Sequence, residues 1–117
     1  MREPPHPKTQ DIQLSRVLYA LSDPVRLMMI VQLAGGAEFT CSDLSGDRAK
    51  SSMSHHFRTL RDAGLMRTRV VGSVHMNRLR SEDLEALFPG MITAIVAASS
   101  VKTSSRKPAR AAPSPKK

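Results

Sequence analysis

The side chains of this chain best suited to metal binding or catalysis are two adjacent histidines, His55 and His56, and a single cysteine, Cys41. Successive residues of a helix point about 100° apart, so the two imidazoles cannot face one ion, and chelation from one helix needs ligands at i and i+4. The helical neighbours that could complete such a pair are Ser51, Ser52, Thr59 and Leu60. Catalysis by Cys41 with a histidine would require a third group to orient the base, and none stands out. We therefore expect no metal, no other cofactor and no enzymatic activity.

The two histidines are expected to face opposite sides of a helix over residues 49–63. His56 follows Met53 by three residues and precedes Leu60 by four, which places it on the apolar side as a hydrogen-bonded residue at the edge of the core. His55 shares the other side with Ser51, Ser52 and Arg58. Small hydroxyl residues in a first turn allow close approach to a duplex, and a helix N-terminus attracts phosphate. His55 is thus predicted to face DNA, and His56 the core.

Charge is concentrated in one contiguous third of the chain, whose formal net charge is +8. Residues 48–80 hold eight arginine and lysine residues against one acid, a net charge of +7, whereas residues 10–47 and 81–99 each carry −3. This distribution favours an anionic partner for the middle third, with nucleic acid as the leading candidate. The alternative is a solvated basic face without a partner. With no Trp, one Tyr and three Phe, a stacking platform for single strands is not expected.

The two ends differ in composition from the rest. Residues 1–9 are Pro-rich, and residues 100–117 combine Ser, Pro, Ala and basic side chains with almost nothing to bury. We expect both to be disordered, flanking one domain over residues 10–99. The basic tail could add nonspecific attraction to phosphate or serve solubility alone.

Cysteine usage and hydropathy suggest the compartment. A single cysteine leaves no internal disulfide and suits the reducing cytoplasm. There is no run of about 18 apolar residues for a membrane span, and we expect no secretion leader.

Hydrophobic periodicity predicts a mainly α domain with a small β-hairpin. Apolar residues from Leu14 to Leu21 recur at helical spacing, and Asp23-Pro24 is typical of an N-cap followed by the first residue of a helix. That second helix is apolar nearly all round and ends at Gly35-Gly36. A short extended piece (EFT), a short helix over residues 42–45 and a turn at Gly46-Asp47 precede the histidine-bearing helix, which Gly64 closes.

Two short runs, MRTRVV and VHMNRL, flank Gly72-Ser73, a signal for a two-residue hairpin of type II′. A broad apolar stripe then extends from Leu84 to Val96, with Ser81 as its expected cap and Pro89 expected to kink or split the helix. The order helix, helix, short helix, turn, helix, hairpin, helix is that of a winged helix-turn-helix.

The segments LSDPVRLMMIVQL and SMSHHFRTLRDAGLMRTRVVGSVHMNRL resemble the arsenic-repressor (ArsR) family of winged helix-turn-helix transcription regulators, over roughly residues 10–99. The resemblance implies a homodimer paired mainly through the first and last helices, with two recognition helices on a palindromic operator. The stripe on the last helix independently favours a partner. The interface residues expected from these two helices are Leu14, Val17, Leu18, Leu21, Leu87, Phe88, Met91, Ile92 and Ile95.

The same resemblance implies the DNA contacts. Lys50, Ser51, Ser52 and His55 match the groove-facing part of the recognition helix. Ser54 fits the serine that the family has before the two histidines and is included among the expected DNA contacts, and Arg58 is expected to lie toward the DNA backbone. If residues 71 and 74 pair across the turn, Arg67, Arg69 and Arg78 share a face of the wing as candidate phosphate contacts. Ser73 stands where the family commonly has a basic wing residue, and Met76 and Asn77 replace the usual wing aromatics.

The metal motifs of the family are absent. Thr40 and Ser42 occupy the places of the C-x-C thiolates, with Cys41 between them, and the stretch SEDLEALFPGMITAIVAASS has no histidine for the zinc type. Cys41 is a candidate redox residue, with a small buried hydrophobe as the alternative. The inducer stays unknown.

From these observations we expect a cytoplasmic, dimeric, sequence-specific DNA-binding transcription regulator that represses by covering promoter DNA. A nonspecific or architectural DNA-binding protein driven by the basic tail is one alternative. A protein-interaction adaptor that leaves the groove surface unused is another.

Overall fold

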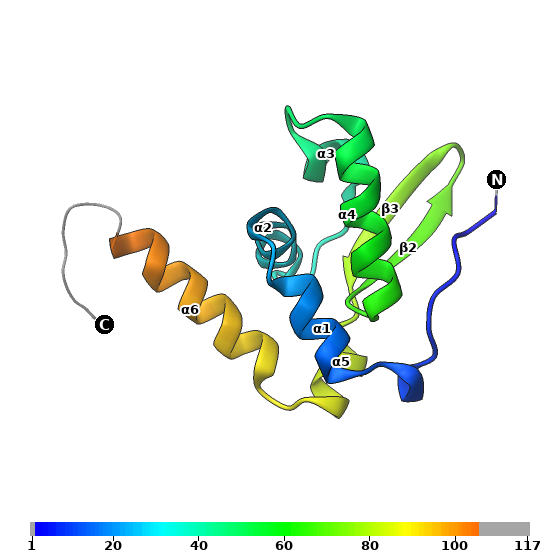
Figure 1. Cartoon of the computed structure of the whole chain (residues 1–117). Helices are drawn as coiled ribbons and strands as arrows, with labels where there is room; N and C mark the ends of the chain where they lie inside the picture. Colours follow the sequence, from blue (N-terminus) through cyan, green and yellow to red (C-terminus); the bar gives the residue numbers. More distant parts are fainter. Residues whose placement is uncertain (1, 106–117) are drawn as a thin grey trace.

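The computed structural model describes the backbone of residues 2–105 and the side chains of residues 2–99. It has the winged helix-turn-helix architecture predicted from the sequence (Figure 1). The elements follow in the order η1 Thr9–Asp11, α1 Leu14–Leu21, α2 Pro24–Leu33, β1 Phe39–Thr40, α3 Cys41–Ser45, α4 Lys50–Ala63, β2 Met66–Val71, β3 Val74–Leu79, α5 Ser81–Leu87 and α6 Met91–Ser105. The predicted helix-turn-helix is therefore α3, the turn after it, and α4.

A buried polar junction joins the first two helices to α4. Asp23 is the N-cap of α2, and its carboxylate accepts from the backbone N–H groups of Val25 and Arg26 at 2.9 and 3.0 Å, as Asp-Pro predicted. The buried Arg26 side chain donates from Nε to the carbonyl of Ala20 at 2.7 Å and from Nη1 to Nδ1 of His56 at 3.1 Å. One guanidinium thus fixes α1, α2 and α4 relative to one another.

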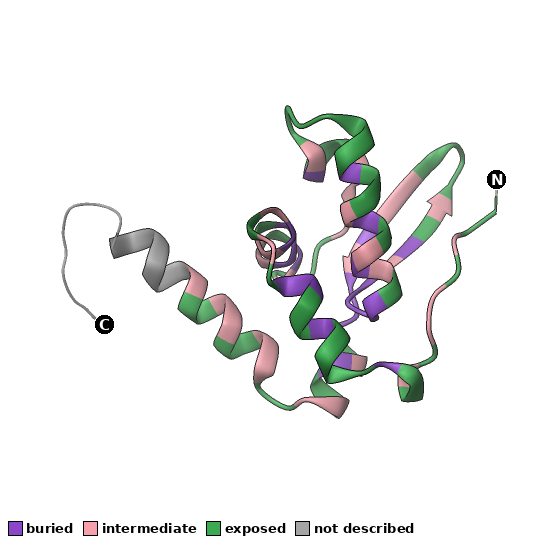
Figure 2. Cartoon of the chain, in the orientation of Figure 1, coloured by how far each residue is buried: buried purple, intermediate pink, exposed green. Residues whose placement is uncertain are grey.

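The core lies where these three helices meet the sheet, and Figure 2 shows the buried segments on their facing sides. In α4 the buried residues are Met53, Phe57, Leu60 and Ala63, which follow helical spacing and leave the opposite face to solvent. The other fully buried apolar side chains include Val17, Met29, Ile30, Leu33, Leu65, Met66 and Leu84.

The wing is a three-stranded antiparallel sheet in the order β1-β3-β2. Val71 pairs with Val74, so the hairpin loop is the expected two residues, and Gly72 has the positive φ of 63° that such a tight turn requires. The expected extended piece becomes β1, which pairs with β3. Asn77 joins all three strands, because its Oδ1 accepts from Thr68 at 2.6 Å and its Nδ2 donates to the carbonyl of Phe39 at 3.2 Å.

Gly64 ends α4 in the left-handed conformation, with φ of 88°. A Cβ atom at this position would lie 2.5 Å from the Ile12 side chain, so the close packing as well as the backbone requires glycine.

The last helical stretch is split, one of the two outcomes expected at Pro89. α5 ends at Leu87, and α6 begins at Met91 after Gly90, whose φ is 79°. The expected cap was wrong, since Arg80 is the N-cap of α5 and Ser81 is already helical. α6 leads away from the body of the domain (Figure 1), and its described side chains are half-buried or exposed. Its bounds reach beyond residue 99, where we had expected the domain to end.

The N-terminal residues depart from the expected disorder, because residues 2–8 run beside β2 and contact it. The part of the basic tail over residues 106–117 lies outside the described residues. Within residues 2–105, no helix combines the length and hydropathy needed to cross a membrane.

Candidate nucleic-acid interface

The first two turns of α4 present a row of exposed polar side chains. Lys50, Ser51, Ser52, Ser54 and His55 are all exposed. The N-cap, Ala49, supplies no side-chain hydrogen bond, so the N–H groups of the first turn keep their capacity to donate to an external anion. The hydroxyls of Ser52 and Ser54 donate back to the carbonyls of Ala49 and Lys50, both at 3.0 Å, which leaves their oxygen lone pairs available as acceptors.

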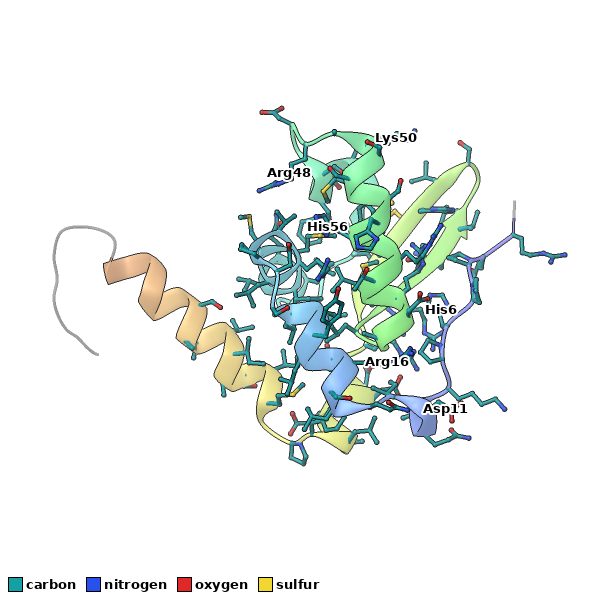
Figure 3. All side chains as sticks on the ribbon, in the orientation of Figure 1. His6, Asp11, Arg16, Arg48, Lys50 and His56 are labelled. Atoms are coloured by element: carbon teal, nitrogen blue, oxygen red, sulfur yellow. The ribbon has the colours of Figure 1, made fainter. Side chains whose placement is uncertain are left out.

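The two histidines face different surroundings, as predicted. His55 is exposed, whereas the half-buried His56 accepts from Arg26 through Nδ1 and lies 4.0 Å from the Asp23 carboxylate (Figure 3). Because a guanidinium can only donate, Nδ1 of His56 is the acceptor of this hydrogen bond. His56 is a structural residue of the helix junction, and contact of His55 with DNA stays a prediction.

The three wing arginines do not carry equal free charge. Arg67 and Arg78 are register partners across β2 and β3, and both are half-buried. Arg69 donates from Nε and Nη2 to the two carboxylate oxygens of Glu38, both at 2.7 Å. This pair lowers the pKa of Glu38 and raises that of Arg69. Arg78 has a looser contact of 3.7 Å with Glu82. Arg69 is thus the most neutralised of the three.

A groove of about 770 Å³ lies between α3, α4 and the beginning of β3. Among the residues that the structure describes, no acidic side chain lines this groove, and its cationic lining residues are Arg48, Lys50, Arg58 and Arg61. Arg48 lies in the bend just before α4, and Lys50 is the first residue of this helix (Figure 3). Burial, followed by the nearby Arg58 cation, opposes the charged form of Arg61 and lowers its pKa, although Asp62 acts the other way. An anion in the groove would offset this penalty, so its chemistry suits a phosphate group.

The groove itself was not predicted from the sequence, although several of its lining residues were. Arg48 and Arg61 belonged to the basic stretch but had no assigned role. His75 carried no sequence signal at all, yet it lines the groove, and its Nε2 is the one buried side-chain nitrogen or oxygen in the described part of the chain without a hydrogen-bond partner.

Cys41 is half-buried at the start of α3, and it also lines the groove. Its Sγ accepts from Nδ2 of Asn77 at 3.5 Å. Beside it, Thr40 and Asp43 form a reciprocal capping box, with contacts of 3.0 and 3.2 Å, so Thr40 has a structural task. Over the described residues, no group of three or more His, Cys, Asp and Glu side chains could hold a metal. A redox role for Cys41 stays a prediction.

The expected dimer residues fall into two groups. Leu14 and Leu18 are 45% and 49% exposed, whereas Val17 and Leu21 are buried within the chain's own core. Because α1 must first pack on α2 and α4, two of its four apolar residues are not available to a partner, which corrects the expected interface. The residues from the C-terminal helices are partly buried at the edge of the core: Leu87, Phe88, Met91, Ile92 and Ile95.

Comparison with known proteins agrees with this geometry. Residues 21–69 match a helix-turn-helix domain family. The chain is 34% identical over 90 residues to the uncharacterized HTH-type transcriptional regulator YceK of Bacillus subtilis, covering 73% of this chain and 89% of the relative. It is 36% identical over 74 residues to the arsenical resistance operon repressor of Staphylococcus xylosus, covering 62% and 71% respectively.

A solved structure extends the likeness to three dimensions. The solution structure of a homodimeric winged helix-turn-helix DNA-binding domain from Mycobacterium bovis, a possible ArsR-family regulator, aligns with a TM-score of 0.59 and 25% identity. The alignment covers 77% of this chain and 82% of that one. Two relatives of 34% and 36% identity and a solved domain with a TM-score of 0.59 agree on the family, and the chain belongs to the ArsR family of helix-turn-helix transcriptional regulators.

Proposed function

We propose that this protein is a homodimeric repressor that recognises a palindromic operator and covers promoter DNA. The observation that carries the proposal is the continuous surface formed by the exposed first turns of α4 and the cation-lined groove beside them. A recognition helix reads base edges, whereas phosphate contacts set register and most of the affinity. The surface offers both kinds of group next to each other.

Base readout belongs to the polar side chains at the start of α4. Ser52 and His55 have the short reach and the donor and acceptor groups that base edges require, and Ser51 and Ser54 are small enough for the helix to enter a major groove. Lys50 and Arg58 border the groove and approach phosphate from either side of this turn.

The cation-lined groove gives a path for the DNA backbone. We expect the sugar–phosphate backbone between the major and the minor groove of the DNA to pass between the recognition helix and the wing. The cation-lined groove of the protein lies at this place, between α4 and the start of β3. Arg67 and Arg78 on the wing, with Arg69 as a weaker third, would contact the next phosphates.

Dimerisation is supported by apolar surface that the single chain leaves open. Leu14 and Leu18 are exposed on α1, and α6 places Ile92, Ile95 and Val96 on a helix that leaves the domain body. The M. bovis domain of the same fold is homodimeric. A two-fold dimer would place its recognition helices about one helical turn of DNA apart, or a multiple of it, which is why a palindrome is expected.

The role of repressor comes from the S. xylosus relative, which is named a repressor of an arsenical resistance operon. We propose that this chain shares with that relative the mode of action of a repressor, which is occupation of promoter DNA. We do not propose that this chain senses arsenicals, because binding of such a soft ion needs two or three thiolates and Cys41 is the only thiol of the chain.

The test is binding to the DNA upstream of the protein's own gene and to a scrambled duplex of equal composition, at about 50 and 200 mM salt. We expect a preference of about 10³ or more that persists at the higher salt. Equal binding to both duplexes that collapses with salt would overturn the proposal for that DNA. It would favour nonspecific coating by the basic tail, and deletion of residues 106–117 would then remove most of the binding.

A further inference from the structure

The N-terminal residues 2–8, here called the strap, lie along the outer edge of the wing. Figure 1 shows the chain rising beside β2 toward the hairpin turn. Two side chains of the strap meet this edge: Nε2 of His6 accepts from the backbone N–H of Thr68 at 2.9 Å, and a carboxylate oxygen of Glu3 accepts from the N–H of Val70 at 3.3 Å. The strap is therefore held by β2 at two points.

These contacts satisfy groups that an edge strand otherwise leaves open. β2 is at the edge of the sheet, and the N–H groups of Thr68 and Val70, two residues apart, point away from β3. A regular strand cannot form here, because Pro4, Pro5 and Pro7 have no N–H to donate. The strap uses side-chain acceptors in place of a backbone ladder.

The base of the strap is anchored in buried structure. Arg80, which is 2% exposed, donates from Nη1 to the carbonyl of Pro7 at 2.9 Å and from Nε to Asp83 at 3.0 Å. The hydroxyl of Thr9 donates to the other oxygen of Asp83, also at 3.0 Å. The strap therefore starts from a fixed point, and its direction toward the wing tip is determined.

The wing tip lacks a cation of its own. Gly72 and Ser73 form the loop, and the flanking Val71 and Val74 are 46% and 43% exposed, an apolar pair at the place that would approach DNA. The contact of Glu3 with Val70 brings the preceding residue, the exposed Arg2, to this end of β2. Arg2 lies far from the wing in the sequence, so the sequence of the wing alone does not indicate that Arg2 lies beside it.

We propose that the docked strap completes the DNA-binding surface, with Arg2 supplying the phosphate contact at the wing tip and His6 acting as the latch that holds the strap. The proposal rests on the proposed DNA-binding function for its purpose. Docking itself is a property of the free protein and can be measured without DNA.

His6 makes the latch sensitive to pH. Its Nε2 must be unprotonated to accept from Thr68, and the cations facing the imidazole are Arg67 of β2, Arg80 after β3 and Arg61 of α4. Burial, followed by these three cations, lowers the pKa of His6 below 6.5, while Glu3 opposes the shift. The undocked strap therefore binds a proton more readily. Docking is at full strength above pH 6.5 and is lost as the pH falls through the lowered pKa.

The first experiment measures docking by hydrogen exchange of the Thr68 amide in the full chain without DNA, between pH 5 and 8. We expect His6→Ala to raise the exchange rate by about tenfold or more at pH 7.5, beyond the intrinsic pH effect. His6→Gln keeps an acceptor and should restore protection without the loss in mild acid. Equal protection of the Thr68 amide in wild type and His6→Ala would overturn the latch.

The second experiment measures the salt dependence of DNA binding. Arg2→Ala should make the slope of log K against log salt shallower by about 1, the loss of one phosphate contact. His6→Ala should cause the same loss, and the double variant should lose no more than either. Lys8→Ala is the matched control, because Lys8 is an exposed strap cation at the base, remote from the tip, and the slope should not change.

An unchanged slope in Arg2→Ala would overturn the role of Arg2, even if the Thr68 amide is protected. The slope is measurable on nonspecific duplex as well as on operator. Failure of the wild type to prefer its own upstream DNA would count against the proposed repressor function, and the exchange experiment would still decide whether the strap docks.

Discussion

Two exposed regions of this molecule have opposite chemistry. The surface over α4 and the wing is polar and cationic, and the side chains beneath it are packed: Met53, Phe57 and Leu60 bury one face of α4 completely or nearly so. On α1 and α6, here called the α1 and α6 surface, apolar side chains stay partly open to solvent: Leu14 and Leu18 are about half exposed, and Ile92 and Ile95 are half-buried. Beneath the first surface the apolar side chains are buried within the chain, whereas at the second surface they remain partly exposed to solvent.

The difference shows which partner each surface needs. Full burial of an exposed Leu or Ile side chain stabilises an interface by about 1.5–3 kcal/mol. The α1 and α6 surface can therefore associate with a second copy of the chain without attraction between charges. The α4 surface has little apolar area to bury and depends on release of counterions from a polyanion. Dimerisation through the α1 and α6 surface is therefore expected to be insensitive to salt, whereas DNA binding at the α4 surface should depend steeply on it.

The largest effect should come from reversing the chemistry of the α4 surface. Ser52→Glu adds a carboxylate where base edges and phosphates are expected, and it should reduce affinity for operator by about 10³-fold, to the nonspecific level. Because Ser52 is exposed, the thermal unfolding midpoint should stay within about 2 °C of wild type. Fluorescence anisotropy with labelled operator would measure the loss. Ser81→Glu on α5 is the control, and a Ser52→Glu protein with intact operator preference would refute the assignment of α4.

A charge on the apolar surface should act through assembly. Ile95→Glu places a carboxylate on the half-buried side of α6 and should convert the dimer to a monomer. Operator affinity would then fall by about 10²-fold, because one half-site replaces two. Sedimentation velocity reads the mass directly. Thr93→Glu, at an exposed position of the same helix, should leave the dimer intact. A dimeric Ile95→Glu protein would place the interface elsewhere.

Much of the fold could be predicted because local signals and tertiary packing agree. Asp23-Pro24 specified the cap and the start of α2, and Gly72-Ser73 specified a two-residue loop that fixed the register of Arg67 opposite Arg78. The stripe of α4 predicted which histidine turns inward. These features depend on residues close together in the sequence, where backbone geometry leaves few alternatives.

The features that were missed depend on distant residues. The strap looked disordered because its prolines and polar residues have no periodicity, but its contacts are with Thr68, Val70 and Arg80, more than sixty residues away. The burial of Val17 and Leu21 within the protomer could not be separated from that of Leu14 and Leu18, since all four share helical spacing. The groove also depends on the tertiary arrangement, because its lining residues Arg61 and His75 come from different elements, α4 and β3.

A change to the junction beneath both surfaces should lower stability and leave each surface unchanged. Asp23→Ala removes the N-cap of α2 and should cost about 1 kcal/mol of unfolding free energy in urea denaturation. The backbone N–H of Arg26, and then that of Val25, lowers the pKa of Asp23. The contribution is therefore present above the ordinary value of 3.8 and is lost as the pH falls through the lowered value.

Asp47→Ala is the control for this change, because Asp47 is an exposed turn residue. Its unfolding free energy should stay within about 0.5 kcal/mol of wild type. An Asp23→Ala protein that is equally destabilised at pH 3 and pH 7 would show that the carboxylate charge has no part in the cap.

The smallest effect should come from freeing a cation within the DNA surface itself. Glu38 holds Arg69 through two contacts of 2.7 Å, and Glu38→Gln keeps the shape while it removes the negative charge. Affinity for duplex DNA should rise by about threefold at 50 mM salt, and the salt slope should steepen by about 1 because Arg69 can then reach a phosphate. Glu82→Gln should do less, since its 3.7 Å contact with Arg78 is looser and more exposed. If Glu38→Gln raised affinity without changing the slope, Arg69 would not contact phosphate, and the DNA surface of the wing would be reduced to Arg67 and Arg78.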